Sequence, residues 1–213
     1  MADVGAVLWD FGGVILSSPF EAFGAYERQR GLPEGLIRRL NATDPDTNAW
    51  ARLERSEVDL AGFAELFEAE AAAAGHALDA REVLALLAGE VRPEMAEALR
   101  RVKAAGLRQA VLTNNIAPMD GDGDAAARPE VVEVMALFDV VVESSKVGVR
   151  KPDPRFYDLA LEAVGVEPTA AVFLDDLGVN LKPARALGIR TIKVVDPADA
   201  LAELEAILGF PLG

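Results

Sequence analysis

The sequence predicts an α/β fold, a Rossmann-like parallel sheet with a small all-helical cap inserted after the first strand. Short apolar runs alternate with helical patterns over most of the chain, which is typical of a parallel sheet covered on both faces. Residues 19–89 contain no convincing strand and interrupt this alternation directly after the first apolar run. We therefore expect a core domain of residues 1–16 and 90–213 and a cap domain of residues 17–89.

The elements of the predicted core follow from apolar runs and helix-end signals. The first strand is Val4–Trp9, which ends at Asp10 and a glycine pair that indicates a turn. A helix begins at Pro93 and ends at Gly106, since proline suits the first helical position and glycine the residue after the last. The later strands are predicted at Gln109–Leu112, Val140–Val142, Ala171–Leu174 and Ile189–Val195. The later helices are predicted at Pro129–Leu137, Asp153–Val164, Gly178–Leu187 and Pro197–Leu208.

Composition excludes several kinds of chemistry. The 213 residues include no cysteine and one histidine, so disulfides, thiolate metal sites and multi-histidine sites are absent. The 35 acidic and 21 basic residues give a net charge of −14, which argues against nucleic acid and anionic membranes as partners. The sequence has no signal-peptide pattern and no apolar run long enough to span a membrane, which favours a cytoplasmic protein. We expect a monomer or a weak homodimer.

Polar side chains follow three of the predicted strands. Because the carboxyl ends of parallel strands meet at one edge of a sheet, we expect these side chains to lie close together. Lys151, in a proline-rich loop, would join them there. Carboxylates suit Mg²⁺, and a lysine with backbone amides suits a phosphoryl oxygen. The strand-end residues are Asp10, Thr113, Asn114, Asp175 and Asp176.

Four motifs in this order resemble those of the haloacid dehalogenase superfamily. They are Asp10-Phe11-Gly12-Gly13-Val14, Leu112-Thr113-Asn114, Lys151-Pro152-Asp153-Pro154 and Phe173-Leu174-Asp175-Asp176. Together they extend over almost the whole chain. The run from Phe173 to Ala184 is most similar to the phosphatase-type N-terminal domain of soluble epoxide hydrolases and its bacterial relatives, which has a small helical cap.

The resemblance implies a Mg²⁺-dependent phosphatase acting on a small phosphorylated metabolite. Asp10 would be the nucleophile that forms an aspartyl-phosphate, which water then hydrolyses. Asp176, with Asp175 as a further candidate, would hold Mg²⁺ together with the Asp10 carboxylate and the Gly12 carbonyl.

The same resemblance assigns residues to the phosphoryl group. Thr113 and the Asn114 amide would bind its oxygens, and Gly12 and Gly13 would line the substrate site. Lys151 would balance the negative charge of the nucleophile and the phosphoryl group. Catalysis of this kind rests mostly on positioning and electrostatics.

Gly12 departs from the family pattern. The phosphatases of the family usually have a second aspartate at this position, which protonates the leaving group and then activates water. General acid–base catalysis contributes about 10²–10⁴-fold. The glycine therefore predicts a slow enzyme, a substrate whose leaving group needs little protonation, or a replacement acid from the cap or the substrate.

Two other functions remain open. A metal-independent 2-haloacid dehalogenase would have an aromatic residue at position 12, and the adjacent acids Asp175 and Asp176 would repel each other without a cation. A catalytically weak binding or regulatory protein would explain Gly12 but not the retention of buried charges, which are costly to keep. The sequence does not identify the substrate.

The acidic stretch Asp120–Asp124 resembles the beginning of a calcium-binding EF-hand loop. The sixth position of such a loop is glycine and the twelfth is glutamate, but this chain has Ala125 and Val131 there. We therefore interpret the stretch as an acidic loop without a calcium site.

Overall fold

The computed structural model describes residues 4–115 and 128–213, and it contains a five-stranded sheet in the order β3-β2-β1-β4-β5. All neighbouring strands are parallel, and each predicted strand is present. The predicted α/β fold is therefore confirmed. The acidic stretch Asp120–Asp124 lies outside the described residues. The strands are β1 (Ala6–Trp9), β2 (Arg108–Thr113), β3 (Val140–Glu143), β4 (Ala171–Asp175) and β5 (Arg190–Lys193).

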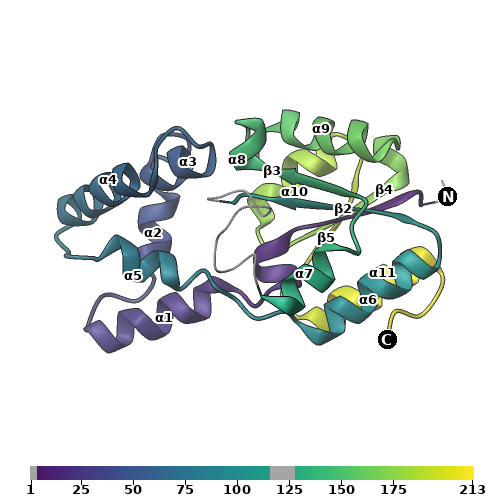
Figure 1. Cartoon of the computed structure of the whole chain (residues 1–213), viewed down its shortest axis with the longest axis horizontal. Coiled ribbons are helices and arrows are strands. Elements are labelled where there is room, and N and C mark those ends of the chain that lie inside the picture. The colour runs from purple at the N-terminus through teal and green to yellow at the C-terminus, as the bar shows by residue number, and fades with distance from the viewer. Residues whose placement is uncertain (1–3, 116–127) are drawn as a thin grey trace.

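Helices cover both faces of the sheet (Figure 1). Alternate β1 side chains enter different apolar clusters, with Val7 and Trp9 on one face and Ala6 and Leu8 on the other. One face is covered by α6 (Pro93–Ala104), α7 (Pro129–Met135) and α11 (Pro197–Leu208). The other face is covered by α9 (Pro154–Val164) and α10 (Gly178–Ala186). The short helices α8 (Ser144–Val147) and η2 (Pro168–Ala170) lie in the connections before α9 and before β4.

Residues 17–89, which we call the helical segment, contain helices and no strand. Their buried side chains form an apolar cluster of their own, in which Trp50 packs edge-on against Phe63 and Phe67. The Asp79 side chain accepts hydrogen bonds from the backbone N–H groups of Arg81 and Glu82 and so caps the helix that follows it. The helices are α1 (Pro19–Arg30), α2 (Leu36–Ala42), α3 (Ala49–Glu54), α4 (Leu60–Ala73) and α5 (Ala80–Ala85).

The chain passes between the sheet and the helical segment twice, and the two passages are bonded together. The Ser17 N–H donates to the Glu90 oxygen at 2.8 Å, and Leu16 and Val91 form an antiparallel bridge. A Cβ atom on Gly89 would lie 2.7 Å from the Ser17 oxygen, so only glycine permits this approach. We call these paired passages the connection.

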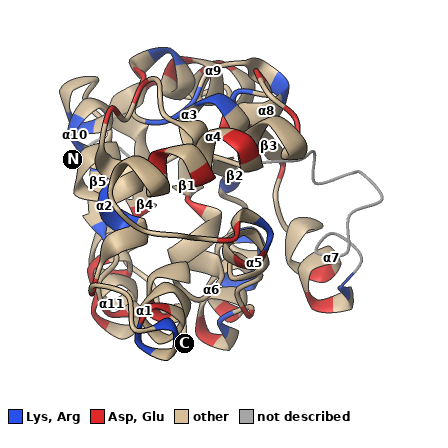
Figure 2. Ribbon diagram, turned by 90° about the vertical axis from the view of Figure 1, so that its left-hand side faces the viewer, with Lys and Arg blue, Asp and Glu red and all other residues tan. Residues whose placement is uncertain are grey.

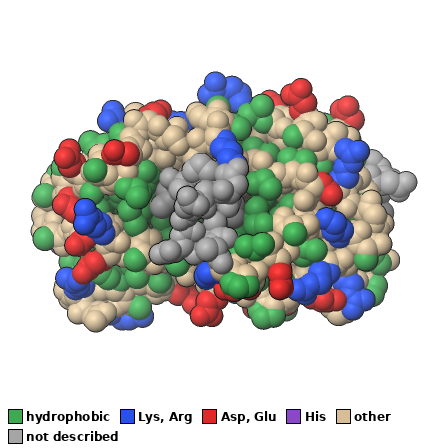
Figure 3. Space-filling view, viewed as in Figure 1, with side chains coloured by type: hydrophobic (Ala, Val, Ile, Leu, Met, Phe, Trp, Pro, Cys, Tyr) green, Lys and Arg blue, Asp and Glu red, His purple; other side chains and the backbone are tan. Residues whose placement is uncertain are grey.

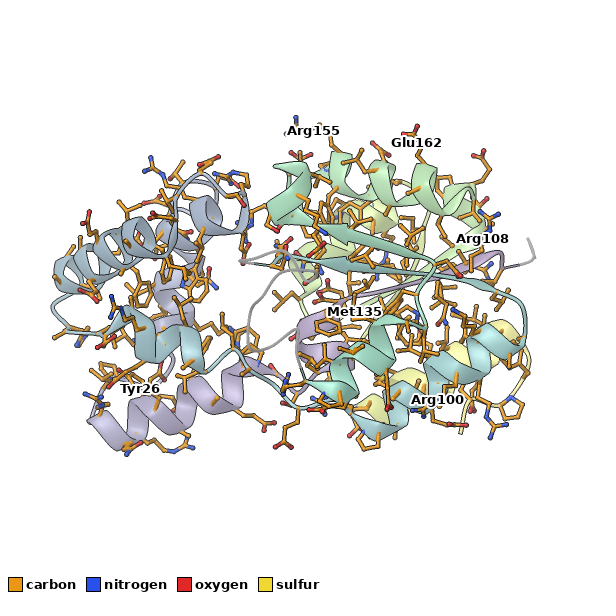
Figure 4. The ribbon with its side chains drawn as sticks, in the orientation of Figure 1. Tyr26, Arg100, Arg108, Met135, Arg155 and Glu162 are labelled. Atoms are coloured by element: carbon orange, nitrogen blue, oxygen red, sulfur yellow. The ribbon has the colours of Figure 1, made fainter. Side chains whose placement is uncertain are left out.

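The helical segment lies at the carboxyl edge of the sheet, because β1 runs from the N-terminus toward it (Figure 1). Tyr26 on α1 lies between α1 and α5 and donates to Glu82 at 2.8 Å (Figure 4). Acidic and basic side chains are interspersed on the face shown in Figure 3. None of the helices in the described parts of the chain is long and apolar enough to cross a membrane.

Candidate active site

Asp10 lies at the end of β1, where the chain turns sharply. Its N–H donates to the Leu174 oxygen at 2.9 Å, and its carboxylate accepts from the Phe11 N–H at 2.7 Å. The following turn, η1 (Phe11–Ile15), leaves the sheet at the edge that faces the helical segment. The first bond fixes the backbone of Asp10 and the second its buried side chain at this edge.

Lys151 lies between two of the predicted site carboxylates. Its Nζ atom is 2.8 Å from Asp10 Oδ1 and 2.8 Å from Asp175 Oδ2, and the side chain is almost fully buried. The Asn114 side chain holds the Lys151 backbone from both sides, because it accepts from the N–H at 2.9 Å and donates to the carbonyl at 3.0 Å. The structure therefore brings Lys151, and not its neighbour Arg150, to Asp10.

Asp175 has a full set of protein partners. One oxygen accepts from the Leu177 N–H at 2.8 Å and the other faces Lys151, while the Asn180 amide donates to both. The Tyr157 hydroxyl donates to the Asn180 carbonyl at 2.6 Å. Asn180 and Tyr157 had no role in the sequence interpretation. Asn180 lies five residues after Asp175, in the first turn of a helix, and this spacing could have indicated that its side chain reaches back to Asp175.

Asp176 has a different environment from Asp175. Apart from its own backbone N–H, no group in the described residues donates a hydrogen bond to its carboxylate. The carboxylate lies directly over Gly13, whose φ of +85° favours glycine. A Cβ atom on Gly13 would be 2.3 Å from Asp176 Oδ2. Gly13 therefore permits the close approach of the nucleophile turn and the acidic turn.

Gly12 lies one residue earlier and is not constrained in this way. Its φ of −74° and ψ of 126° are accessible to any residue. A Cβ atom there would meet no atom within 4 Å among the described residues. Glycine at this position thus leaves space beside Asp10.

Three carboxylates form a compact acidic cluster. Asp10, Asp175 and Asp176 each place an oxygen within 4.8 Å of the others. With Lys151 charged, the ionised cluster has an excess of two negative charges, the charge that one divalent cation would balance. Oxygen donors at this spacing suit Mg²⁺, and the Asp176 carboxylate is available for it. The residues present therefore fit the predicted metal.

The pKa values of the cluster reflect this excess charge. Burial raises the pKa of Asp10 well above its usual range, repulsion from Asp175 and Asp176 adds to the rise, and Lys151 opposes it. Burial and the Asp175 charge raise the pKa of Asp176 to about 6. Burial alone would lower the pKa of Lys151, but its two carboxylate partners outweigh this effect and raise it.

The helical segment contributes charges close to the cluster. The positive charge of Arg38 on α2 opposes part of the rise in the pKa of Asp176. Burial raises the pKa of Glu54, at the end of α3, and the positive charge of Lys151 opposes part of that rise. Figure 2 shows α2 and α3 in front of the sheet when the molecule is viewed from the side of the helical segment. Thr113, the remaining predicted site residue, is buried at the end of β2 beside Asn114.

Comparison with known proteins identifies the family. Residues 4–188 match the model of the haloacid dehalogenase-like hydrolases. The chain belongs to this family. The resemblance predicted from the four motifs is thus confirmed, and the protein is a hydrolase with phosphatases among its relatives.

Two mammalian relatives align with almost the whole chain. Mouse acyl-CoA dehydrogenase family member 10 is 39% identical over 97% of this chain and 19% of its own length. Pig bifunctional epoxide hydrolase 2 is 30% identical over 97% of this chain and 39% of its own length. The chain therefore spans about a fifth to two fifths of these relatives. A Mycobacterium tuberculosis phosphatase is 37% identical over 49% of this chain and 45% of its own length.

Solved structures of the family share the fold. An L-2-haloacid dehalogenase from Xanthobacter autotrophicus, with chloropropionic acid covalently bound, has a TM-score of 0.61, 21% identity, and coverage of 95% of this chain and 82% of its own. A Bacteroides thetaiotaomicron enzyme of the haloacid dehalogenase family, in complex with magnesium and inorganic phosphate, has a TM-score of 0.57 and 18% identity. The alignment covers 89% of this chain and 93% of that enzyme's chain. At these identities the likeness is one of fold.

Proposed function

We propose that this haloacid dehalogenase-like hydrolase is a Mg²⁺-dependent phosphatase acting on a small phosphorylated metabolite. The observation that carries the proposal is the acidic cluster of Asp10, Asp175 and Asp176 around one lysine. Its excess of two negative charges favours a divalent cation and disfavours a metal-free site. The similarity to a Mycobacterium tuberculosis phosphatase supports the same choice.

The residues at the edge of the sheet suit phosphoryl transfer through Asp10. The Asp10 carboxylate oxygen would attack phosphorus, the bond from phosphorus to the leaving oxygen would break, and water would later hydrolyse the aspartyl-phosphate. Lys151 would hold the Asp10 carboxylate in place and offset the charge of the phosphoryl oxygens. Thr113 and the backbone amides of Gly12, Gly13 and Asn114 would bind those oxygens.

Asp176, the Asp10 carboxylate and the Gly12 carbonyl would hold Mg²⁺. The ion would supply charge that stabilises the transferred phosphoryl group. Asp175 is a weaker candidate ligand, because its oxygens already accept from Lys151, Asn180 and the Leu177 N–H. Its role in the proposed site is to hold Lys151 and the acidic turn in position.

The space at Gly12 bears on the substrate. Without an acid there, the leaving group is best protonated by the substrate itself, or has a low pKa and needs no proton. An anomeric sugar phosphate, an acyl phosphate or an aryl phosphate meets this condition. We propose that residues 17–89 act as a cap domain that limits access to such small molecules, with residues 1–16 and 90–213 as the core domain.

The test is hydrolysis of an aryl phosphate and of a panel of phosphorylated metabolites, with Mg²⁺ and after its removal by a chelator. We expect activity only with Mg²⁺. Replacing the nucleophile by Asp10→Asn should lower kcat by about 10³-fold or more. Beryllium fluoride with Mg²⁺ should raise the Tm of the parent, since a ligand specific for the folded site stabilises it.

The same assays separate the alternatives. Activity that survives Asp10→Asn would rule out Asp10 as the nucleophile. Halide release from a 2-haloacid without Mg²⁺ would identify a dehalogenase instead. A binding or regulatory protein would show neither activity, and beryllium fluoride would leave its Tm unchanged.

A further inference from the structure

The loop before Lys151 is attached to the helical segment as well as to the core. The Arg150 Nε atom lies 2.6 Å from Glu54 Oε2, and its Nη1 donates to the Pro45 carbonyl at 2.7 Å. Nearby, the Ser56 hydroxyl donates to the Ser145 carbonyl at 3.0 Å. We call these three contacts the clasp, because they join the two parts of the molecule through side chains, whereas the connection joins them through the backbone.

The ion pair of the clasp is shielded from water. The side chains of Glu54 and Arg150 are 12% and 16% exposed, whereas those of Asp153 and Arg155, an ion pair three residues further on, are 32% and 73% exposed. Burying a charge pair costs desolvation energy that its attraction repays only in good geometry, so such a pair contributes little net stability. Breaking it leaves a buried charge without a partner. The pair is thus suited to specifying one arrangement of the helical segment rather than to stabilising the fold.

Arg150 and Lys151 are adjacent but make contacts on opposite sides of their loop. Arg150 forms an ion pair with Glu54 and donates to the Pro45 carbonyl, while Lys151 Nζ lies between the carboxylates of Asp10 and Asp175. A movement of the helical segment that separates Glu54 from Arg150 would therefore act on the residue next to Lys151. The distances from Lys151 Nζ to both carboxylates are 2.8 Å, so a displacement of Lys151 would change the electrostatics at Asp10.

We propose that Glu54 and Arg150 are positioning residues for the reaction: their ion pair holds the helical segment closed over the acidic cluster and keeps Lys151 in place beside Asp10. The inference rests on the proposed phosphatase function for its kinetic consequence. Its structural consequence, closure of the helical segment, is independent of what the enzyme hydrolyses.

Closure is tested by measuring a distance across the molecule. The chain has no cysteine, so two can be introduced for nitroxide spin labels without background. Leu60 on α4 and Val195 after β5 are exposed, at 57% and 80%, and suit Leu60→Cys and Val195→Cys. We expect a narrow distance distribution in the labelled parent, and a longer, broader one when Glu54→Gln or Arg150→Met is added.

Positioning is tested by kinetics of the same substitutions in the unlabelled protein. Both variants should lower kcat/KM by about 10–10²-fold, the effect of a displacement near 1 Å of a catalytic group. The reciprocal exchange, Glu54→Arg with Arg150→Glu, should restore part of both kcat/KM and the closed distance, which a variant with a disrupted fold would not do. Glu57→Gln is the matched control, because it removes a neighbouring ion pair with Arg55 in which the Glu57 side chain is 49% exposed, and it should change neither quantity.

The outcomes separate this inference from the proposed function. The proposed positioning role would be overturned if Glu54→Gln and Arg150→Met had the same distance distribution, or the same kcat/KM, as Glu57→Gln. If the parent hydrolyses no phosphate ester but the distance still responds to Glu54→Gln, the clasp stands as the closing contact and the phosphatase assignment fails.

Discussion

Gly12 and Gly13 are adjacent in the turn after Asp10, but their surroundings differ. Gly13 has a left-handed backbone and lies directly under the Asp176 carboxylate, which a Cβ atom would approach to 2.3 Å. Gly12 has an ordinary extended backbone, and a Cβ atom there would meet nothing within 4 Å of it in the described part of the chain. Of these two positions, only position 13 requires glycine for the fold. At position 12 the backbone would accept any residue, and the glycine leaves space beside Asp10 where the family resemblance leads us to expect an acid.

The most damaging change at this turn should be Gly13→Ala. The left-handed conformation costs a residue with a Cβ atom about 1–2 kcal/mol, and the new methyl group also displaces Asp176. We expect loss of Mg²⁺ binding and a decrease in kcat of about 10²-fold or more, since Asp176 could not keep its position beside Asp10. Calorimetric titration with Mg²⁺ and steady-state kinetics measure the two effects. Unchanged Mg²⁺ affinity in Gly13→Ala would show that the contact with Asp176 does not position a metal ligand.

Gly12→Asp should have the opposite effect on activity. The added carboxyl group occupies free space and supplies the acid that the site lacks, so kcat on alkyl phosphates should rise by about 10-fold or more. The rise should be much smaller for an aryl phosphate, whose leaving group needs little protonation. The ratio of the two rates is therefore the informative measurement.

Gly12→Asn and Gly12→Ala are the controls for this change. The asparagine side chain has nearly the size of aspartate without its transferable proton, and the alanine variant tests the added Cβ atom alone. Equal rates for Gly12→Asp and Gly12→Asn on alkyl phosphates would mean that another group already serves as the acid.

The two glycines also show how far the sequence could be interpreted. The strand-end acids were predictable, because the carboxyl ends of parallel strands share one edge and apolar runs mark where each strand ends. The strand order, the different surroundings of Gly12 and Gly13, and the bond between Asn180 and Asp175 were not predictable. These features depend on how elements distant in sequence pack together, and the hydrophobic pattern of the sequence does not specify such contacts.

The contact between Glu54 and Arg150 illustrates the same limit. Each residue alone is an ordinary charged side chain, one in a helix and the other in a loop 96 positions later. Only the placement of the helical segment against the core brings them together. The gathering of the acids and Lys151 at one edge of the core could thus be predicted from motifs, whereas the contacts that the helical segment makes with the core required the structure.

The smallest predicted effect is the pH dependence of the stability that Asp176, the carboxyl group over Gly13, contributes to the folded protein. The pKa of Asp176 is about 6 in the folded protein and 3.8 ordinarily, so folding favours its protonated form. The stability that this carboxyl group contributes is therefore fully present below pH 3.8 and is lost as the pH rises through about 6. Between about pH 5 and pH 8 the loss amounts to about 1–1.5 kcal/mol in the metal-free protein. For a protein of this size that corresponds to a decrease in Tm of about 2–6 °C.

Asp176→Asn isolates this contribution, because the amide has nearly the same shape and does not titrate. Thermal melts of the metal-free proteins at pH 5 and pH 8 should show a smaller decrease in Tm for the variant than for the parent. Mg²⁺ should raise the Tm of the parent at pH 8 more than at pH 5, since protons compete with the cation for the same oxygens, and should have little effect on the variant. Parallel pH profiles for the two proteins would mean that Asp176 is not crowded by Asp175. The close approach over Gly13 would then need a different explanation from the binding of a cation.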